Sequence, residues 1–272
     1  MFLRKAAQHW IRRSLITLSI IFLSLLQPGA AIVSAATPTP VDSASTLSAT
    51  QKTTKVILSP NTKYATEMYI ISSGVPGPVV LVTGGIHGNE KAGYLAADQL
   101  RSTTIRSGTL LVIPRANKLA DNANTRAIKG EKDLNRAFPT SKTGQPSYTP
   151  AKAIYAVVKQ YKVNWVMDMH EGYGYSAGGS ASVGQSLIYY PSTACTAMTN
   201  TILKQVNAGI KTSSHRFVAL RYPVGGSLAR SSAQYLGTNS FIFETCTKDS
   251  INTRISEQLL AANTLLKQLK MK

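Results

Sequence analysis

The sequence predicts an α/β fold, a three-layer αβα sandwich with a mixed, largely parallel central sheet. From Thr54 onward, apolar runs of strand length alternate with amphipathic stretches at helical spacing. Strands that alternate with helices form parallel sheets that helices cover on both faces. The 272 residues are 43% hydrophobic and only 15% charged, which is enough apolar material for one large core. We therefore expect a single folded domain.

Each expected element rests on its own run of residues. Continuous apolar runs predict buried strands at 78–83, 109–114, 163–169 and 240–243. Apolar residues at helical spacing predict helices at 90–100, 150–161, 199–210 and 255–269. Gly84-Gly85 ends the first strand, because glycine pairs interrupt regular structure.

The first 36 residues predict a secretory signal peptide. Four basic residues open it: Arg4, Lys5, Arg12 and Arg13. The apolar run Leu15–Leu26 follows, and it is short for the alternative, an uncleaved membrane anchor. We expect cleavage near Ala35 or Ala36 and a secreted or cell-wall-associated protein. Residues 37–53 are rich in Thr, Ser, Ala and Pro and predict a flexible linker, so the folded domain would cover 54–272.

The chain is strongly basic, with a net charge of +18. Without the predicted signal it keeps 26 Lys and Arg against 12 Asp and Glu, a net charge of +14. A secreted protein of this charge is attracted to polyanions such as an anionic cell wall. No dense basic run with interleaved aromatic residues is present, and nucleic acid is not an expected partner. The alternative is that solvated lysines are simply spread over the surface.

The two cysteines, Cys195 and Cys246, are too few for a disulfide-rich scaffold or a cysteine-based zinc cluster. An oxidising compartment would allow them to pair. The sequence does not set the distance between them, so the pairing stays open.

Three predicted strands end at polar residues that could bind a metal or transfer protons. His87 and Glu90 follow the first strand, His170 the third and Glu244 the fourth. In open α/β sheets, ligands bind beyond the carboxyl ends of the strands. We therefore expect these four side chains to share one site.

Two histidines and one carboxylate, with an open fourth position, form a catalytic zinc site. His87 and Glu90 stand three residues apart, so both side chains lie on one side of the turn into a helix, and His170 completes the set. Zinc lowers the pKa of its bound water, and a nearby carboxylate can take the water proton and pass it to a leaving amine. Glu244 is the candidate for that carboxylate.

Each histidine also has a structural interpretation, which is the commoner one. His215 lies in a polar stretch and is interpreted as a surface residue. Glu171 follows His170 and suggests half of a His-Glu-x-x-His helix, but position 174 is Gly, so that motif is absent.

A third polar cluster contains Arg126, Asp133, Asn135 and Arg136. Asn135 and Arg136 would fix a substrate carboxylate. Asp133 would accept the ring N–H of a zinc-bound histidine, and Arg126 would stabilise the oxyanion of the scissile carbonyl. The alternative is a loop with solvated charges.

Four motifs in this order span residues 84–245: Gly85-Ile86-His87-Gly88-Asn89-Glu90, Asp133-Leu134-Asn135-Arg136, Asp168-Met169-His170 and Phe243-Glu244-Thr245. Together they resemble the zinc carboxypeptidase superfamily, and most of all its succinylglutamate desuccinylase/aspartoacylase branch. The resemblance implies a sheet between helical layers and one catalytic zinc per chain.

The resemblance also implies a role for each matching residue. His87, Glu90 and His170 would hold the zinc, and Glu244 would be the general acid/base. Arg126 would support the carbonyl oxygen, Asn135 and Arg136 would bind the carboxylate, and Asp133 would support the first histidine.

Some features depart from the family pattern. Carboxypeptidases of this superfamily often use a mobile tyrosine, for which both Tyr222 and Tyr235 are candidates. The desuccinylase and aspartoacylase enzymes commonly carry an extra C-terminal domain, whereas one helix after Glu244 predicts a trimmed catalytic core. Those enzymes act on intracellular metabolites, so their substrates do not transfer directly to an exported protein.

Three functions follow from these expectations. The first is a deacylase that cleaves the amide bond of an N-acyl amino acid through a zinc-activated water. The second is a metallocarboxypeptidase that removes the C-terminal residue of peptides, such as cell-wall peptides. Both act on a small molecule or peptide with a free carboxylate. The third is a basic wall-binding protein without catalysis, against which the retained His87, Glu90, His170 and Glu244 argue.

Overall fold

The structure, a computed structural model, describes residues 50–272. The predicted signal peptide (1–36) and most of the predicted linker (37–53) lie outside the described residues. The first strand begins at Lys52, two residues before the expected start of the domain, because Lys52 and Thr53 already pair with Ser72 and Ile71.

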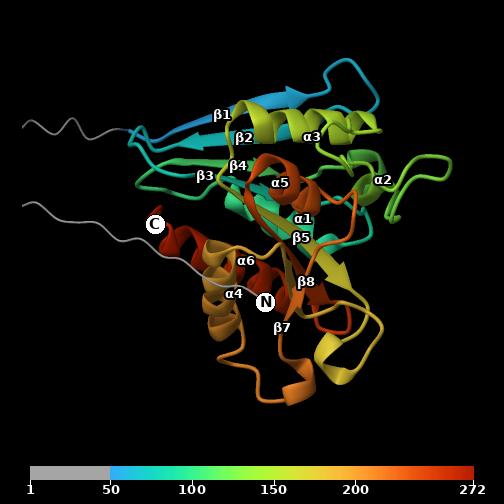
Figure 1. The fold of residues 1–272 in the computed structure, drawn as a ribbon, viewed down its shortest axis with the longest axis vertical. Coiled ribbons are helices and arrows are strands. Elements are labelled where there is room, and N and C mark those ends of the chain that lie inside the picture. The colour runs from blue at the N-terminus through green and yellow to red at the C-terminus, as the bar shows by residue number, and fades with distance from the viewer. Residues whose placement is uncertain (1–49) are drawn as a thin grey trace, which may run out of the picture. The chain divides into compact units, whose positions relative to one another are not determined.

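A mixed sheet of eight strands, in the order β1-β2-β4-β3-β5-β8-β6-β7, forms the centre of the described part (Figure 1). The strands are β1 (Lys52–Leu58), β2 (Thr66–Ser72), β3 (Val79–Thr83), β4 (Thr109–Ile113), β5 (Trp165–Gly172), β6 (Ser186–Tyr189), β7 (Val218–Arg221) and β8 (Asn239–Cys246). The central strands β4, β3, β5 and β8 are mutually parallel. Antiparallel pairs join β1 to β2, β2 to β4 and β6 to β8. The predicted α/β architecture is confirmed.

Helices cover both faces of this sheet (Figure 1). One face carries α1 (Lys91–Leu100), α4 (Thr193–Val206) and α6 (Ile251–Gln268), and the other carries α3 (Thr149–Gln160) and α5 (Leu228–Leu236). The short elements are α2 (Lys118–Ala123), η1 (Leu134–Arg136), η2 (Ser176–Gly178) and η3 (Ser213–His215). None of the helices in residues 50–272 has both the length and the hydropathy that a membrane span requires.

Each face of the sheet has its own apolar core, because successive side chains of a strand point to opposite faces. In β3, Val80 and Val82 pack with α1, α4 and α6, whereas Leu81 packs with α3 and α5. In β5, Met167 and Val166 divide in the same way. Full burial of such a side chain stabilises the fold by about 1.5–3 kcal/mol. The alternation also decides which polar side chains meet at the strand ends.

Several element bounds differ from the prediction by two or more residues. Helix α6, for example, begins at Ile251 instead of at 255, and α4 ends at Val206 instead of at 210. β5 continues to Gly172 and β8 to Cys246, because the two strands pair along their whole length. His170 and Glu244 therefore belong to the strands themselves. Helix α4 begins at Thr193, six residues before the predicted start at 199, because the Ser192 side chain accepts a hydrogen bond from the Cys195 N–H and caps it.

Cys195 and Cys246, whose pairing the sequence left open, are both buried free thiols. Cys195 lies on α4, where its Sγ is 3.6 Å from the carbonyl oxygen of Ser240. Burial raises the pKa of the Cys195 thiol to about 12. This thiol is therefore packed as a small apolar side chain.

Candidate metal centre

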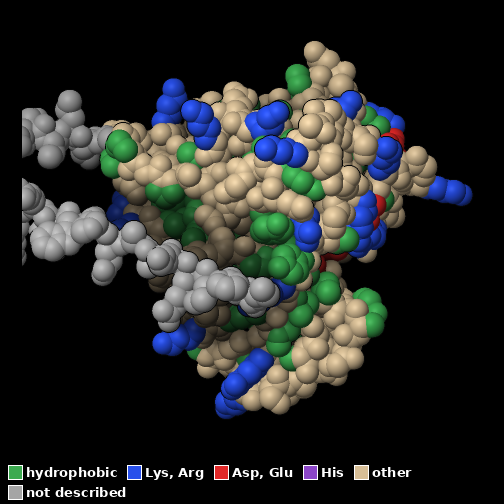
Figure 2. Space-filling view, in the orientation of Figure 1, with side chains coloured by type: hydrophobic (Ala, Val, Ile, Leu, Met, Phe, Trp, Pro, Cys, Tyr) green, Lys and Arg blue, Asp and Glu red, His purple; other side chains and the backbone are tan. Residues whose placement is uncertain are grey.

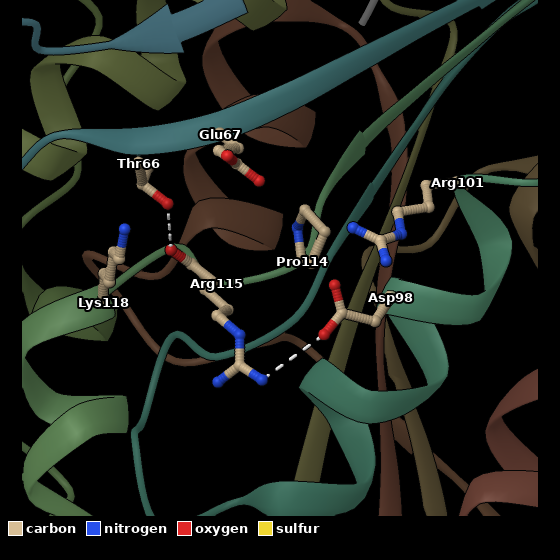
Figure 3. A pocket seen from close by; sticks show the side chains of 7 residues that line it. All are labelled: Thr66, Glu67, Asp98, Arg101, Pro114, Arg115 and Lys118. Carbon is tan, nitrogen blue, oxygen red and sulfur yellow. Dashed lines mark hydrogen bonds and ion pairs between the residues drawn. The ribbon is translucent and has the colours of Figure 1, made fainter. Parts of the chain in front are cut away.

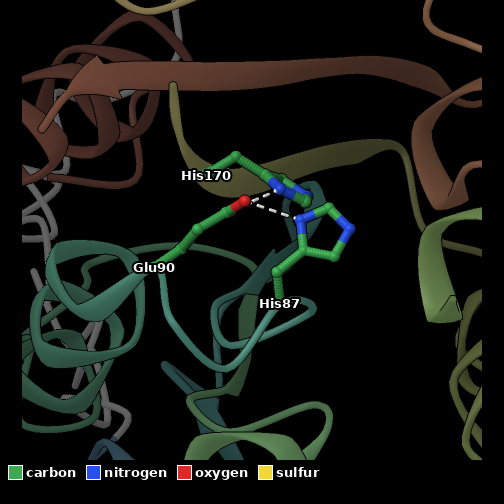
Figure 4. A group of neighbouring side chains, drawn as sticks. All are labelled: His87, Glu90 and His170. Carbon is green, nitrogen blue, oxygen red and sulfur yellow. Dashed lines mark hydrogen bonds and ion pairs between the residues drawn. The ribbon is translucent and has the colours of Figure 1, made fainter. Parts of the chain in front are cut away.

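His87, Glu90 and His170 lie together at the carboxyl ends of β3 and β5, as the sequence predicts. All three are buried, and one possible ligand atom from each falls within 4.8 Å of the others. The Glu90 carboxylate lies between the two imidazoles (Figure 4), with Oε1 2.7 Å from His87 Nδ1 and Oε2 2.8 Å from His170 Nδ1. Both Nδ1 atoms and one carboxylate thus converge on a single point.

Two glycines allow the segment before α1 to make this turn. Gly85 has a φ of +66°, a left-handed conformation that glycine adopts without steric cost. Gly88 packs on the backbone of α2, where an added Cβ would lie 1.9 Å from the carbonyl carbon of Ala120. The Glu90 N–H then donates to the His87 carbonyl oxygen at 3.2 Å and brings both side chains to one side.

The outer nitrogen of each imidazole faces a carboxylate. Asp133 Oδ1 lies 3.2 Å from His87 Nε2, and Asp168 Oδ2 lies 3.0 Å from His170 Nε2. The first pair is a hydrogen bond, whereas the second is an ion-pair contact without hydrogen-bond alignment. Asp168 is itself fixed by the Thr83 hydroxyl, which donates to its Oδ1 at 2.6 Å. Such outer partners orient metal-binding histidines.

The charges of the cluster fit a divalent cation. Glu90 is buried, which raises its pKa, but the charges of His170 and His87 outweigh burial and lower it to about 2. Burial lowers the pKa of His170, yet the charges of Asp168 and Glu90 raise it well above its usual value. A proton on His170 thus offsets part of the carboxylate charge of the cluster. A zinc ion at the same point would replace that proton.

Glu244 stands beside His170, because the two residues are register partners on the parallel strands β8 and β5. Its side chain has the same orientation as that of Ile242, toward the α3 and α5 face of the sheet. Burial raises the pKa of Glu244 to about 8, and the negative charges of Glu90 and Asp168 add to the effect although His170 opposes it. A carboxyl group that titrates near neutral pH suits an acid/base role.

Arg126 reaches the same centre from the loop after α2. Its Nε and Nη2 donate to Asp133 Oδ2 at 3.2 and 3.0 Å. Its Nη1 lies 3.8 Å from Glu90 Oε1, and about half of the side chain is exposed. The guanidinium therefore lies at the open side of the cluster.

Asn135 and Arg136 lie in η1, directly after Asp133. The Asn135 Oδ1 accepts the Leu228 N–H at the start of α5, so its NH₂ group is the end left for a ligand. Arg136 Nη1 donates to the Asn135 carbonyl oxygen at 2.8 Å, and the residue is exposed. The loop before α5 packs on this segment at Gly226, where a Cβ would lie 2.8 Å from the Arg136 carbonyl oxygen.

The structure distinguishes the two candidate tyrosines. Tyr222 is 56% exposed, has a φ of +65° and precedes the loop that packs on Arg136. Such a φ is unusual for a bulky side chain and often marks a functional segment. The Tyr235 hydroxyl is engaged instead with the Thr140 carbonyl oxygen. His215, the remaining histidine of the described part, stacks on Tyr175 and takes no part in the cluster.

Two residues of this centre received no role from the sequence, Asp168 and Glu171. Asp168 precedes His170 by two positions, and the two-residue period of a strand places both on one face. That spacing was the available signal. Glu171 points to the opposite face, where its Oε2 accepts the Ala92 N–H of α1 at 2.9 Å, and its own N–H donates to Glu90 Oε2 at 3.1 Å. No pattern in the sequence indicates these contacts.

Solved structures with this fold include bacterial hydrolases. The apo structure of the cell shape determinant Csd4 from Helicobacter pylori has a TM-score of 0.64 and 20% identity, over 76% of this chain and 55% of that one. Its mDAP-bound form, described as a D,L-carboxypeptidase, has a TM-score of 0.62 and 21% identity, over 72% and 52%.

A third structure, a succinylglutamate desuccinylase/aspartoacylase from Rhodobacter sphaeroides, has a TM-score of 0.58 and 19% identity, over 82% of this chain and 65% of that one. The chain thus spans between about half and two thirds of the length of these structures, and the likeness establishes the shared fold. No curated protein matches the sequence significantly.

A family model matches residues 76–216, just over half of the chain. The match contains His87, Glu90, Arg126, Asn135, Arg136 and His170, and Glu244 lies beyond it. This chain belongs to the succinylglutamate desuccinylase/aspartoacylase catalytic-domain family.

Proposed function

We propose that this protein is an exported, zinc-dependent hydrolase that cleaves an amide bond in a substrate with a free carboxylate. The observation that carries the proposal is the convergence of His87, Glu90 and His170 within 4.8 Å, with Glu244 on the adjacent strand. Two histidines and one carboxylate are the ligand set of catalytic zinc sites that keep a position open. One zinc per chain is expected.

The residues around the cluster have separate roles in the proposed reaction. Zinc, when bound, supplies the Lewis acidity that lowers the pKa of a water molecule. A Glu244 carboxylate oxygen accepts a proton from the attacking water and returns it to the leaving nitrogen. Arg126, at the open side of the cluster, offers N–H groups to the carbonyl oxygen where negative charge develops.

Asn135 and Arg136 bind the substrate carboxylate in this proposal. The exposed guanidinium of Arg136 can form two parallel hydrogen bonds to a carboxylate, and the Asn135 amide can donate a third. A carboxylate held there fixes the distance between the zinc and the bond that is cleaved. N-acyl amino acids and peptides both carry such a group.

A second candidate is a carboxypeptidase that acts on peptides, including wall peptides. The likeness to Csd4, described as a D,L-carboxypeptidase, favours it, and the proposed export would favour it as well. The family match favours the deacylase. Association of the basic protein with an anionic cell wall would place a carboxypeptidase beside its substrate.

We predict that Glu244→Gln keeps the zinc and loses hydrolysis. The amide preserves the shape of the carboxyl group and cannot take up the proton of the water. A loss of about 10²–10⁴-fold in kcat is expected for the removal of one acid/base group. Steady-state assays with zinc-loaded protein measure kcat, and metal analysis measures the zinc content per chain.

Glu67→Gln is the matched control, because Glu67 pairs with Lys55 on the sheet edge and has no contact with the centre. It should leave kcat unchanged. Full activity of the Glu244 variant would remove the residue from the mechanism. A panel of N-acyl amino acids and of peptides with free or amidated C-termini separates the deacylase from the carboxypeptidase.

A further inference from the structure

In the described part of the chain, basic side chains are mostly exposed and acidic side chains are mostly buried or partly buried. None of the 11 Asp and Glu among residues 50–272 is exposed, whereas 22 of the 26 Lys and Arg are. Soluble proteins usually intersperse both signs on their surfaces. Here the carboxylates that reach the surface are only partly exposed. They pair with few lysines, such as Lys55 with Glu67 and Lys63 with Glu131, so the surface of the described part is strongly basic. Figure 2 shows the same imbalance on one face.

Two hollows on this surface lie along α3 and share Lys159. One, of about 400 Å³, is lined by Lys152, Tyr155 and Lys159, and the other, of about 500 Å³, by Lys159, Lys162 and the segments that begin β5 and β8. No acidic residue lines either one. None of the three lysines makes an ion pair with another described residue.

The cavity between α1 and β2 provides a contrast (Figure 3). It also holds basic side chains, but Asp98 pairs with Arg115 at 3.3 Å and Glu67 lines the same space. Its charges are largely matched within the protein. The hollows along α3 are the ones whose charges need a partner from outside.

The spacing of the lysines indicates the shape of that partner. Lys152 and Lys159 are seven residues apart, which places them on one face of α3 about 10 Å apart along its axis. Lys162 follows the end of the helix. Lysines spaced along a helix can contact successive negative charges of a linear polymer. A small anion is instead bound by several donors that converge on one point. Tyr155 is buried, so the hollows offer no exposed aromatic side chain on which nucleic-acid bases would stack.

The larger hollow lies at the end of the sheet opposite the candidate metal centre, and the smaller one lies farther along α3. Val163, Asn164, Thr238 and Asn239, at the amino ends of β5 and β8, line the larger one. His170, five residues beyond Trp165 on β5, is therefore about 17 Å away along the strand. A polymer bound along α3 leaves the metal centre open to substrate.

We propose that the α3 hollows are the docking site for a linear phosphodiester polymer of the cell envelope. This inference rests on one part of the proposed function, the association with an anionic cell wall, and it assigns a binding site to that association. Lys152, Lys159 and Lys162 contact successive phosphates of the polymer. The polymer holds the protein at α3 and near the amino ends of β5 and β8. The candidate metal centre, at the carboxyl ends of the strands, stays open to the substrate.

The test uses the purified chain and immobilised poly(glycerol phosphate), with affinity measured at several salt concentrations. The triple variant Lys152→Gln/Lys159→Gln/Lys162→Gln should lose at least tenfold in affinity. The slope of log K against log salt should become less steep by about two, because a single-stranded polyanion releases about 0.7 counterion for each phosphate contact. The control Lys204→Gln/Lys211→Gln/Lys267→Gln removes the same charge elsewhere and should lose about twofold at most.

Equal losses in the two triple variants would overturn the proposal, because binding would then be diffuse. So would an absence of wild-type binding, or tighter wild-type binding to anionic lipid vesicles or to single-stranded DNA than to the polymer. Hydrolysis of a small soluble substrate should be unchanged in both variants. A wild-type protein that hydrolyses nothing but binds the polymer through α3 would refute the proposed catalysis and leave the docking site standing.

Discussion

At the scale of single residues, Arg136 is the one that we propose to select substrates with a free carboxylate. Its guanidinium is exposed beside the centre, and its main chain is held by the Gly226 loop, where a Cβ would lie 2.8 Å from its carbonyl oxygen. The planar fork of Arg fits a carboxylate with two parallel hydrogen bonds, whereas Lys presents a single point charge. In the proposed role, Arg136 would recognise both the charge and the geometry of the substrate carboxylate.

We expect Arg136→Lys to raise KM about tenfold for a substrate with a free carboxylate, which corresponds to about 1.4 kcal/mol. The turnover number should change less, because the reacting groups are untouched. Steady-state kinetics with free and amidated substrates measure the difference, and the amidated substrate should not respond. Arg106→Lys, an exposed control, should match the wild type. An unchanged KM would show that the carboxylate binds elsewhere.

At the scale of elements, Glu171 connects β5, α1 and α6 behind the metal centre. Its Oε2 accepts the Ala92 N–H at the start of α1, its Oε1 is paired with Arg254 of α6, and its N–H donates to Glu90 Oε2. A carboxylate at a helix N-terminus also interacts favourably with the helix dipole. The orientation of Glu90 therefore depends on contacts on the far face of the sheet.

We predict that Glu171→Gln weakens zinc binding about tenfold, in the range found for outer partners of metal ligands. The substitution also leaves the partly buried Arg254 without a counter-charge, which destabilises the fold. The double variant Glu171→Gln/Arg254→Met separates the two effects, because it removes the lone charge. Its melting temperature should recover, whereas its zinc affinity should not. Recovery of both would assign Glu171 a purely structural role.

The sequence predicted the buried central strands and the longer helices, and it missed the exposed strands and the short helices. β3, β4, β5 and β8 are continuous apolar runs because helices bury both of their faces. β1 and α5 have no such pattern: β1 is an exposed edge strand, and α5 is short and rich in serine. The antiparallel pairing of β1 with β2 and of β6 with β8 is likewise a tertiary property without a local signal.

The candidate site divides in a similar way. His87, Glu90, His170 and Glu244 were predictable because each follows or ends an apolar strand. Their distances were not, because these depend on the register of β5 and β8 and on the turn at Gly85. The contacts of Glu171 required the three-dimensional arrangement of three elements.

At the scale of the whole molecule, folding buries one carboxyl group without a partner. Asp121 on α2 is 6% exposed, and neither of its oxygens has a hydrogen-bond partner in the described part. Burial raises the pKa of Asp121 to about 8, an effect that Arg115 opposes and Asp98 and Glu90 reinforce. In the unfolded chain the same group has its usual pKa of 3.8.

The folded protein therefore holds a proton on Asp121 between about pH 4 and pH 8 that the unfolded chain has lost. Stability from this group is full below the lower pKa and is lost as the pH rises through the higher one, by up to about 1.4 kcal/mol per pH unit. We predict that Asp121→Asn reduces the loss of unfolding free energy between pH 5 and pH 7 by roughly 2 kcal/mol. Urea unfolding at equal zinc content measures it. Parallel pH profiles for wild type and variant would show that Asp121 is ionised in the folded state.

The most direct test of the account is the zinc content of the purified protein, measured by mass spectrometry after dialysis against zinc-free buffer. The wild type should retain about one zinc per chain, His170→Ala should retain almost none, and His215→Ala should match the wild type. His215 is the internal control, because it is the one histidine of the described residues outside the cluster. A zinc-free wild type, or equal zinc in the two variants, would contradict the proposed metal centre.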